Sequence, residues 1–209
     1  MSTPRESSAP AHAADPATLR PDVEGREILV CICGGIAAYK TATVVSRLAQ
    51  AGARVTVAMT EAATRFVAPL TFQALSARPV HVSPWDHLDA MDPQHIALAN
   101  RLDAALVAPC TMDCLARLAT GRADDVVSLI LSAVDRTKTP VLLAPAMNMV
   151  MWNQPATRRN LTTLEADGFA LVGPGSGWQA CREVGEGRMS EPEELLAAVA
   201  KACRGRLRG

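Results

Sequence analysis

Short, largely apolar runs alternate along the chain with longer stretches in which apolar residues recur every three or four positions. The short runs suit strands that are covered on both faces of a sheet, and the spacing of three to four predicts helices. The predicted strands are 28–32, 54–59, 79–82, 104–108, 141–144 and 169–172. The predicted helices are 36–51, 64–75, a short one at His95, 112–119, 125–134, 155–167 and 192–202. Strands that alternate with helices predict an α/β fold with a doubly wound parallel sheet and right-handed crossovers.

The same pattern sets the expected domain limits. Residues 1–23 are rich in Ala, Pro, Ser and Asp without apolar periodicity, so a disordered N-terminal tail is expected there. Residues 24–203 form one predicted domain, with no internal repeat or linker. The last six residues, 204–209, contain Arg204, Arg206 and Arg208 and are expected to form a solvated basic tail.

Composition and charge exclude several classes of protein. The 209 residues include 21 basic and 21 acidic side chains, and no basic patch favours nucleic acid. No apolar run is long enough to span a membrane, and the N-terminus carries no apolar export segment. Because 49% of the residues are hydrophobic and only 3% aromatic, we expect a core of Ala, Val, Leu and Met. The six cysteines lack the spacing of a zinc site, which favours free thiols, no metal and a cytoplasmic location.

Ligands bind at the carboxyl ends of the strands in an open parallel sheet, so the loops after predicted strands are where chemistry is expected. Gly34 and Gly35 allow a tight turn that points N–H groups outward at the start of a helix, which suits a phosphate. Tight packing of strand against helix explains the pair equally well, and the motif is not GxGxxG. Thr60 is either a hydroxyl donor to the same anion or a helix N-cap. The four loops expected to meet are 33–36, 60–61, 109–113 and 145–148.

Asn148 follows a predicted strand that Pro145 ends, and it lies among Met147, Met149 and Met151. A carboxamide held in a soft apolar wall at the sheet edge is a candidate ligand for a substrate. The alternative is that the methionines fill the core while Asn148 caps the next helix.

Two further side chains can transfer protons. His95 opens a predicted helix, so it is either a cap or surface residue or, at the ligand edge, a group that titrates near neutrality. Cys181 lies in the Gly-rich segment 173–187, which is expected to be a mobile flap. Cys181 is therefore either an incidental surface thiol or a proton donor that the flap brings over a substrate. The other five cysteines are expected to pack as small hydrophobic residues.

Several rare segments, taken together and in order, resemble the homo-oligomeric flavin-containing cysteine decarboxylase family, over residues 26 to about 199. They are GGIAAYK at 34–40, MTEAATRFV at 59–67, HIALA at 95–99, GRADD at 121–125, PAMNMVMW at 145–152, ACREVGEGRM at 180–189 and EPE at 191–193. The resemblance implies a Rossmann-like flavoprotein fold of three α/β/α layers and bound FMN. It also implies homotrimers, or multiples of trimers, with the flavin near a subunit interface.

The resemblance further implies roles for individual residues. His95 would be the active-site base, Asn148 would hold the substrate carboxylate, and Cys181 would be the reductive acid. The residues implied in cofactor binding are Gly34, Gly35, Ile36, Thr60, Phe66, Pro109, Thr111, Asp113, Ala146 and Met147. The residues implied in substrate binding are Asn148, Met149, Met151, Arg182 and Arg188.

The reaction that the resemblance implies is FMN-dependent decarboxylation of 4′-phosphopantothenoylcysteine to 4′-phosphopantetheine in coenzyme A biosynthesis. Flavin oxidation of the thiol-bearing carbon gives a thioaldehyde β to the carboxylate, so that CO₂ is lost easily. Re-reduction, with a proton from Cys181, then gives the saturated thiol. Decarboxylases that act on peptide C-termini stop at the enethiol and do not need this thiol, so Cys181 favours the coenzyme A branch.

Two residues depart from the family pattern. Asp113 stands where Asn is usual, and its carboxylate would repel an anionic substrate unless Arg117 or Arg122 neutralises it. Arg182 stands where Gly is usual, so we expect a backbone conformation there that needs no Gly, and a cation that could bind the substrate phosphate. The alternatives are a decarboxylase of peptidyl cysteine or another small thiol acid, and a flavin-binding regulatory protein. A flavin prenyltransferase would share the fold but is expected to lack the motifs around Asn148 and Cys181.

Overall fold

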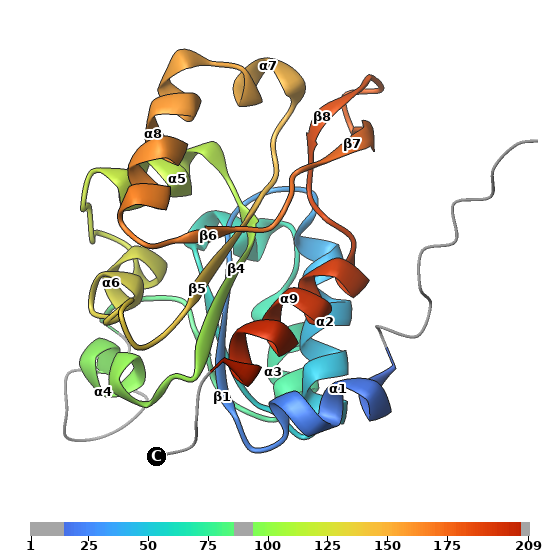
Figure 1. The fold of residues 1–209 in the computed structure, drawn as a ribbon, viewed down its shortest axis with the longest axis vertical. Helices are drawn as coiled ribbons and strands as arrows, with labels where there is room; N and C mark the ends of the chain where they lie inside the picture. The colour runs from blue at the N-terminus through green and yellow to red at the C-terminus, as the bar shows by residue number, and fades with distance from the viewer. Residues whose placement is uncertain (1–14, 86–93, 206–209) are drawn as a thin grey trace, which may run out of the picture.

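The computed structural model describes residues 15–85 and 94–205. At its centre is a six-stranded sheet in the order β3-β2-β1-β4-β5-β6, in which all neighbouring strands are parallel (Figure 1). The strand order turns back between β1 and β4, so the sheet is doubly wound, as predicted. The strands are β1 (Glu27–Ile32), β2 (Arg54–Met59), β3 (Val80–His81), β4 (Ala104–Cys110), β5 (Val141–Pro145) and β6 (Ala170–Leu171).

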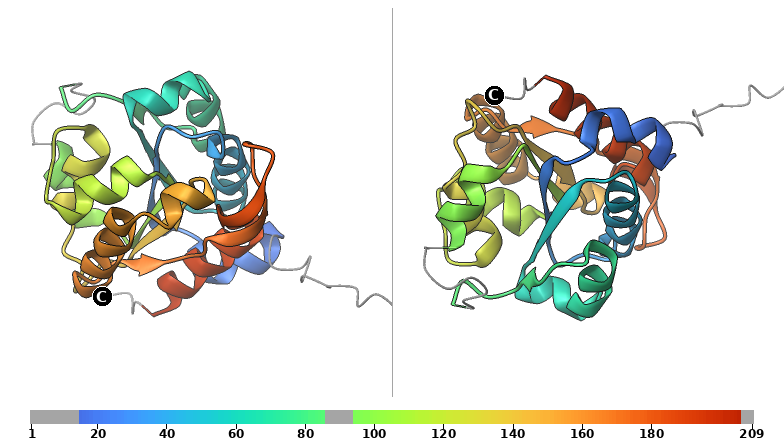
Figure 2. Two further views of the ribbon diagram at one scale, coloured as in Figure 1. Left: turned by 90° about the horizontal axis from the view of Figure 1, so that it is seen from above. Right: turned by 90° about the horizontal axis from the view of Figure 1, so that it is seen from below.

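Helices cover both faces of this sheet, which makes the predicted three-layer α/β/α arrangement (Figure 2). One face carries α1 (Pro16–Val23), α2 (Ala38–Gln50), α3 (Pro69–Ser76) and α9 (Pro192–Arg204). The other carries α4 (Gln94–Arg101), α5 (Met112–Ala119), α6 (Val126–Ser132) and α8 (Pro155–Ala166).

Successive residues of each strand enter opposite cores. In β1, Ile28, Val30 and Ile32 pack toward α2 and α9, whereas Leu29 and Cys31 pack toward α5 and α6. Because both faces are covered, each central strand reads as a continuous apolar run and not as an alternation. This physical reason made the strands visible in the sequence.

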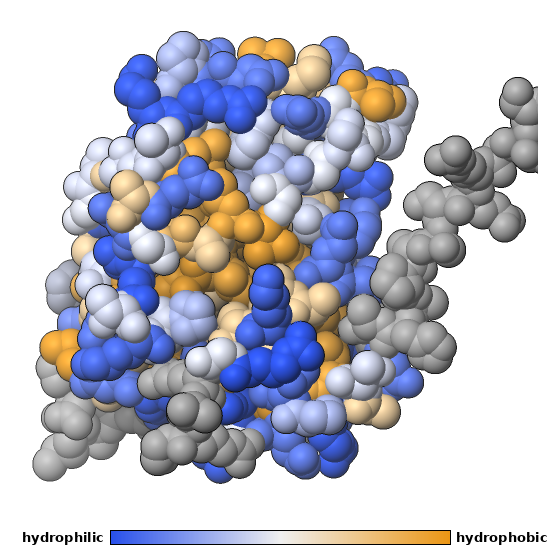
Figure 3. All heavy atoms as spheres, viewed as in Figure 1, coloured by the Kyte–Doolittle hydropathy of each residue, from blue (hydrophilic) through white to orange (hydrophobic). Residues whose placement is uncertain are grey.

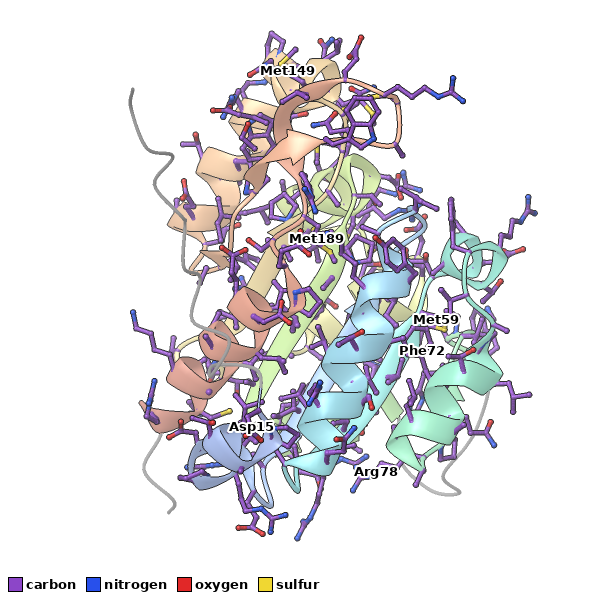
Figure 4. All side chains as sticks on the ribbon, turned by 90° about the vertical axis from the view of Figure 1, so that its right-hand side faces the viewer. Asp15, Met59, Phe72, Arg78, Met149 and Met189 are labelled. Atoms are coloured by element: carbon purple, nitrogen blue, oxygen red, sulfur yellow. The ribbon has the colours of Figure 1, made fainter. Side chains whose placement is uncertain are left out.

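The two ends of the sheet differ in chemistry. At the amino ends of the strands, Glu27 pairs with Arg54 and Arg78, and Asp103 pairs with Arg26. Figure 4 shows Arg78 at this end and Met149 at the opposite end, above the carboxyl ends of the strands. The edge formed by β5 and β6 carries a patch of apolar side chains in the space-filling view (Figure 3), and Leu171 and Val172 are partly exposed there.

The expected disordered tail over 1–23 is wrong for its last part, because residues 16–23 form α1. Asp15 caps this helix by accepting a hydrogen bond from the N–H of Ala17 (3.0 Å), and Pro16 occupies the first helical position. Leu19 and Val23 are buried, and α1 packs against α9 and α2. Asp-Pro at a helix start was the available signal, whereas composition alone pointed to disorder.

The Gly-rich segment 173–187, expected to be a mobile flap, contains regular secondary structure that was not predicted. Two antiparallel strands, β7 (Gly175–Trp178) and β8 (Val184–Arg188), form a hairpin over residues 175–188. Smaller differences from the predicted elements occur elsewhere. Residues Glu61–Arg65 form a 3₁₀ helix, η2, that is separate from α3, and a short helix, α7 (Met149–Trp152), follows Asn148. Strand β4 continues through Pro109 to Cys110.

Some expectations concern residues outside the described ranges. These are the N-terminal tail up to residue 14, most of the loop before His95, and the basic tail from residue 206 onward. Among the helices of residues 15–85 and 94–205, none has the length and apolar character needed to cross a membrane.

Candidate active site

The four predicted loops do meet at one edge, because backbone hydrogen bonds join neighbouring strand ends. Each runs from an N–H to a carbonyl oxygen: Thr60 to Ile32 (3.0 Å), Cys33 to Pro109 (3.3 Å), Ala146 to Cys110 (3.0 Å) and Met147 to Gly187 (2.9 Å). The last bond brings the β7–β8 hairpin to the same edge. The sheet order therefore gathers residues from β1, β2, β4, β5 and the hairpin around one site.

Glycine is required at the start of this site by close packing. A Cβ on Gly34 would lie only 2.5 Å from the Cβ of Ala62 in η2. Gly35 faces the next loop, where an added Cβ would lie 3.6 Å from Cγ2 of Thr111. Tight packing, one of the two explanations that the sequence allowed, therefore accounts for Gly34, whereas the contact at Gly35 would be an ordinary one.

The same turn also has the features of an anion cradle. In the described part of the chain, the N–H groups of Gly34, Gly35, Ile36 and Ala37 make no hydrogen bond. They precede α2, whose N-terminus has no side-chain cap. Free amide donors at the positive end of a 13-residue helix form a site that suits a phosphate.

Three polar residues of the predicted site are helix N-caps. The side-chain oxygens of Thr60, Thr111 and Asn148 accept hydrogen bonds from the N–H groups of Ala63 (3.2 Å), Cys114 (3.3 Å) and Met151 (2.8 Å). Capping uses only acceptors. Each side chain keeps its donors, an O–H on each threonine and the Nδ2 amide of Asn148, for a ligand that accepts hydrogen bonds.

Large apolar side chains stand at the rim of the cradle. Ile36 is 59% exposed and Phe66 is 49% exposed, and Tyr39 on α2 is exposed as well. Ala146 and Met147 are partly buried, and Met149 and Met151 are exposed on α7. A cradle of amides beside exposed apolar side chains suits a ligand that combines a phosphate with a flat ring.

Arg117 offsets the unexpected charge of Asp113. Its Nε lies 2.8 Å from Oδ2 of Asp113, one helical turn earlier, and its guanidinium also pairs with Asp124 and, at 3.7 Å, with Asp125. The hydrogen bond that Arg117 donates to Asp113, followed by the one it donates to Asp124, raises the pKa of Arg117 despite partial burial. Asp113 therefore faces a fixed cation, as the sequence analysis required for an anionic substrate.

Four buried thiols lie beneath these loops: Cys31, Cys33, Cys110 and Cys114. Burial raises the pKa of Cys31 and Cys110, and thiol–thiol hydrogen bonds together with burial raise the pKa of Cys33 and Cys114. A protonated thiol is a weak nucleophile, so these residues act as core side chains, in line with the prediction. The described residues contain no group of His, Cys, Asp or Glu arranged to hold a metal ion.

The hairpin presents Cys181 at its tip. The turn is closed by hydrogen bonds from Gln179 N–H to Glu183 (2.8 Å) and from Arg182 N–H to Gln179 (2.9 Å). Cys181 is exposed, and Arg182 has a left-handed backbone with φ of 65°. The expectation that Arg182 avoids a glycine-type conformation is therefore wrong: the turn keeps that geometry and Arg182 bears its strain.

Arg188 makes an ion pair within the protein. Its Nη2 lies 2.5 Å from Oε1 of Glu191, and the same carboxylate contacts Nζ of Lys40 at 2.9 Å. Glu191 thereby connects α2, the hairpin and the start of α9. The sequence analysis named Arg188 as a substrate ligand and did not identify the role of Glu191.

Gln179 is another residue that sequence reasoning missed. It is 8% exposed, whereas Trp178 beside it is 61% exposed, and its carboxamide contacts both α7 and Cys181. Its position two residues before Cys181 is the only sequence signal, and it does not reveal these contacts.

His95 lies apart from the other site residues within one chain. It is a partly exposed residue in the first turn of α4, and α4 packs against α6. Figure 1 shows α4 at the lower left, whereas α7 and the hairpin lie at the top. The chain therefore brings Asn148 and Cys181 to one edge but does not bring His95 to them.

The chain matches a known protein family. The family described as Flavoprotein matches residues 17–204. Among curated relatives, the coenzyme A biosynthesis bifunctional protein CoaBC of Haemophilus influenzae is 48% identical over 177 residues, which cover 85% of this chain and 44% of that protein. CoaBC of Bacillus subtilis is 42% identical over 179 residues, or 86% of this chain and 43% of that protein. The chain thus spans less than half the length of these relatives.

Several solved structures share this fold, and the similarity extends over nearly the whole length of each of those chains. A cysteine-to-serine mutant of PPC decarboxylase complexed with pantothenoylaminoethenethiol has a TM-score of 0.74 at 28% identity, over 84% of this chain and 97% of that chain. The FMN-binding protein AtHal3 has a TM-score of 0.76 at 27% identity, over 88% and 100%. SpaF, an FMN-dependent cysteine decarboxylase, has a TM-score of 0.74 at 26% identity, over 86% and 96%.

Proposed function

The chain belongs to the Flavoprotein family, and from this premise we propose that it binds FMN and decarboxylates 4′-phosphopantothenoylcysteine to 4′-phosphopantetheine in coenzyme A biosynthesis. The observation that carries the proposal is the single sheet edge that holds an anion cradle at Gly34–Ala37, the amide of Asn148 and the thiol of Cys181. It would act as a carboxy-lyase.

The relatives support this choice of reaction. CoaBC proteins are named for coenzyme A biosynthesis, and PPC decarboxylase and SpaF are decarboxylases of similar fold. The enethiol bound to the PPC decarboxylase mutant is the kind of product expected when CO₂ has left and the final reduction has not taken place.

The residues present fit FMN. The free N–H groups from Gly34 to Ala37 and the hydroxyl of Thr60 would hold the phosphate. Thr111 would donate to the ring system, while Ile36, Phe66 and Met147 would offer apolar contact. When bound, FMN supplies a reversible two-electron oxidation at the thiol-bearing carbon.

Asn148 would bind the carboxylate that leaves as CO₂. Its Oδ1 is fixed by the N–H of Met151, so the plane of the amide is set and Nδ2 is the group left for a substrate. A neutral donor suits this step, because the negative charge moves from the carboxylate to the remaining carbon and sulfur as CO₂ departs. A cation would stabilise the starting carboxylate more than the transition state.

Two residues would handle protons. His95 would act as the base that removes the substrate thiol proton. The thiol of Cys181 would donate a proton to the carbon that has lost CO₂, and the exposed position of Cys181 lets water restore that proton. Arg182 makes no ion pair within the described residues and would contact the substrate phosphate.

The position of His95 supports a homo-oligomer. Helix α4 lies at one end of the folded molecule and α7 at the other. His95 would therefore reach the site of a neighbouring copy. The exposed side chains of Ile36, Tyr39, Phe66 and Leu70 would lie at such an interface, since apolar residues are rarely left exposed in clusters. We assign a homotrimer, or a multiple of trimers, to this arrangement. All six cysteines are free, in keeping with a reducing, cytoplasmic location.

Asp113 favours a second candidate, decarboxylation of a cysteine-ended peptide or another small thiol acid. A carboxylate at this position would select against a phosphorylated substrate. The ion pair of Asp113 with Arg117 reduces this repulsion and supports the first candidate. A flavin-binding regulatory protein would have no need of Asn148 and Cys181 at one edge.

The test uses purified protein loaded with FMN. It is offered 4′-phosphopantothenoylcysteine and, separately, a cysteine-ended peptide, and CO₂ and thiol products are followed by mass spectrometry. We expect equal amounts of CO₂ and 4′-phosphopantetheine, and slow or no reaction with the peptide. A flavin-loaded protein that acts only on the peptide would establish the second candidate instead, and one that acts on neither would indicate a regulatory protein.

A further inference from the structure

Gln179 is a buried carboxamide in an otherwise exposed part of the hairpin. The side chains around it are open to solvent: Trp178 is 61% exposed and Val184 is 68% exposed, but Gln179 is only 8% exposed. A polar side chain is buried at such a place only when its hydrogen-bonding groups are satisfied. The partners of this carboxamide therefore indicate what it holds in place.

All of its partners lie in the two segments that form the site. Oε1 accepts a hydrogen bond from the N–H of Met149 (3.3 Å) and lies 3.5 Å from Sγ of Cys181, which donates to it. Nε2 donates to the carbonyl oxygens of Glu186 (2.7 Å) and Gly185 (3.3 Å) in β8. One side chain thus connects α7, the hairpin backbone and the thiol.

The contact with Met149 also involves Asn148. Met149 is the first residue of α7, and its N–H is one of the donors that a helix start leaves unsatisfied. Asn148 caps the N–H of Met151, and Gln179 caps the N–H of Met149. The two carboxamides therefore share the start of one helix, and the distance between Asn148 and Cys181 is set through Gln179.

We propose that Gln179 is a positioning residue for the proton-returning step, holding the Cys181 thiol in register with Asn148. This inference rests on the proposed function. In that step the S–H bond of Cys181 breaks, a C–H bond forms at the carbon that lost CO₂, and the electron pair stays on sulfur as a thiolate. Water then restores the proton. FMN, once reduced by the substrate, would supply the hydride for the neighbouring carbon.

Cys181 has a second, more distant acceptor, since its Sγ also lies 4.0 Å from Oε2 of the exposed Glu183. The contact with Oε1 of Gln179 is shorter, at 3.5 Å, and Gln179 is the buried partner. The position of the thiol is therefore set by Gln179.

The test substitutes Gln179 in two ways. Gln179→Met keeps the length and removes every hydrogen bond. Gln179→Glu keeps acceptors for Met149 and Cys181 but removes the donor to β8. Gln154→Met is the control, since Gln154 is exposed and its side chain makes no capping hydrogen bond.

Two readouts are measured for each flavin-loaded variant. The first is the ratio of enethiol to saturated thiol formed from 4′-phosphopantothenoylcysteine. The second is the rate of Cys181 alkylation by iodoacetamide at one fixed pH, which is selective because the other five cysteines are buried. The second readout needs no turnover, so it remains informative if the proposed substrate is wrong.

We expect Gln179→Met to release CO₂ while its ratio of enethiol to saturated thiol rises on the order of tenfold, the effect of losing a few hydrogen bonds around one group. Its alkylation should be faster, because the thiol is no longer held by Oε1. Gln179→Glu should keep both the product ratio and the alkylation rate close to wild type, because an acceptor for Met149 and Cys181 remains. The control should match wild type in both.

A purely structural role for Gln179 predicts a different result. Both substitutions would then lower stability while leaving the product ratio unchanged, and they would change the alkylation rate equally or not at all. That outcome would overturn the proposal. A wild-type protein that is inert on the substrate, with faster alkylation of Gln179→Met but not of Gln179→Glu, would contradict the proposed function and leave the Gln179–Cys181 contact intact.

Discussion

Arg182 adopts the left-handed backbone conformation, with φ of 65°, at the tip of the hairpin. A side chain with a Cβ is strained there, by roughly 1–2 kcal/mol, whereas glycine is not. The guanidinium makes no ion pair within the described residues, so nothing on the protein side repays this strain. The arginine is therefore better explained by a ligand than by the fold.

Replacing Arg182 by Gly separates these two effects. Relief of strain should slow hydrogen exchange of the β7 and β8 amides, by up to about fivefold for 1 kcal/mol. At the same time KM for the phosphorylated substrate should rise, with little change for the substrate without phosphate. Glu183→Gly, one residue along, is the matched control and should speed exchange. Equal KM for both substrates would remove Arg182 from phosphate binding.

For several single residues the sequence allowed two explanations. For two of these residues the structure establishes that the side chain caps a helix. Thr60 and Asn148 were either caps or ligands, and the structure makes them caps whose donors remain available. Residue type and position along the chain were enough to predict the alternatives. The contacts of Gln179 and Arg117 were not predictable, because they depend on how the hairpin and α5 fold back on their neighbours.

Among the elements, the β7–β8 hairpin has the least support from the core. Its strands are mostly exposed, and it is held by the hydrogen bond between Met147 and Gly187, by Gln179, and by the carboxylate of Glu191. Lys40, which pairs with this carboxylate, is only 11% exposed in its side chain. Glu191 therefore neutralises a largely buried cation and fixes the hairpin to α2.

Glu191→Gln should loosen this connection. The neutral amide leaves Lys40 and Arg188 without a counter-charge, and because Glu191 itself is 45% exposed we expect a loss of about 1–2 kcal/mol in the free energy of unfolding. Hydrogen exchange of the hairpin amides should accelerate more than that of β4. Glu193→Gln, in the same first turn of α9, is the control. Equal stability of the two variants would show that the ion pairs contribute little.

Element prediction succeeded where burial sets the pattern and failed where hydrogen bonds do. The central strands were predicted because both faces are covered by helices. The hairpin was missed because its four glycines hide the alternation of a strand. Two of them, Gly185 and Gly187, let β8 approach Met149 and Met147. Helix α1 was missed because its apolar residues are few.

The whole molecule contains four thiols in one core, and this has a consequence for stability at alkaline pH. Cys31, Cys33, Cys110 and Cys114 have a higher pKa in the folded protein than their ordinary value of 9.0. A raised pKa contributes stability that is fully present below the unfolded value and is lost as pH rises through the folded value. Stability should therefore fall above about pH 9.

Urea unfolding at pH 7.5, 9 and 10 measures this loss, which can reach about 1.4 kcal/mol per pH unit for each thiol. Cys110→Ala should reduce the slope of stability against pH, because it removes one thiol whose pKa is raised by burial. Equal slopes for wild type and Cys110→Ala would mean that the thiols ionise as easily in the fold as in the unfolded chain.

The distance between α4 and α7 also has a consequence for assembly. If each site takes His95 from one copy and Asn148 from another, His95→Asn and Asn148→Asp should each be inactive alone. Asn148→Asp keeps the N-cap, removes the amide donor and adds a carboxylate. Co-expressed together, the two variants should regain activity at roughly a quarter of their interfaces. No recovery in mixed oligomers would place both residues in one chain's site.

The product of a single turnover tests the central claim most directly, namely that one sheet edge carries out oxidation, loss of CO₂ and return of a proton. FMN-loaded wild type and Cys181→Ser are each mixed with 4′-phosphopantothenoylcysteine and quenched for mass spectrometry. We expect CO₂ from both, with the saturated thiol from wild type and the enethiol from Cys181→Ser. Saturated thiol from Cys181→Ser, or flavin-loaded wild type that releases no CO₂, would contradict it.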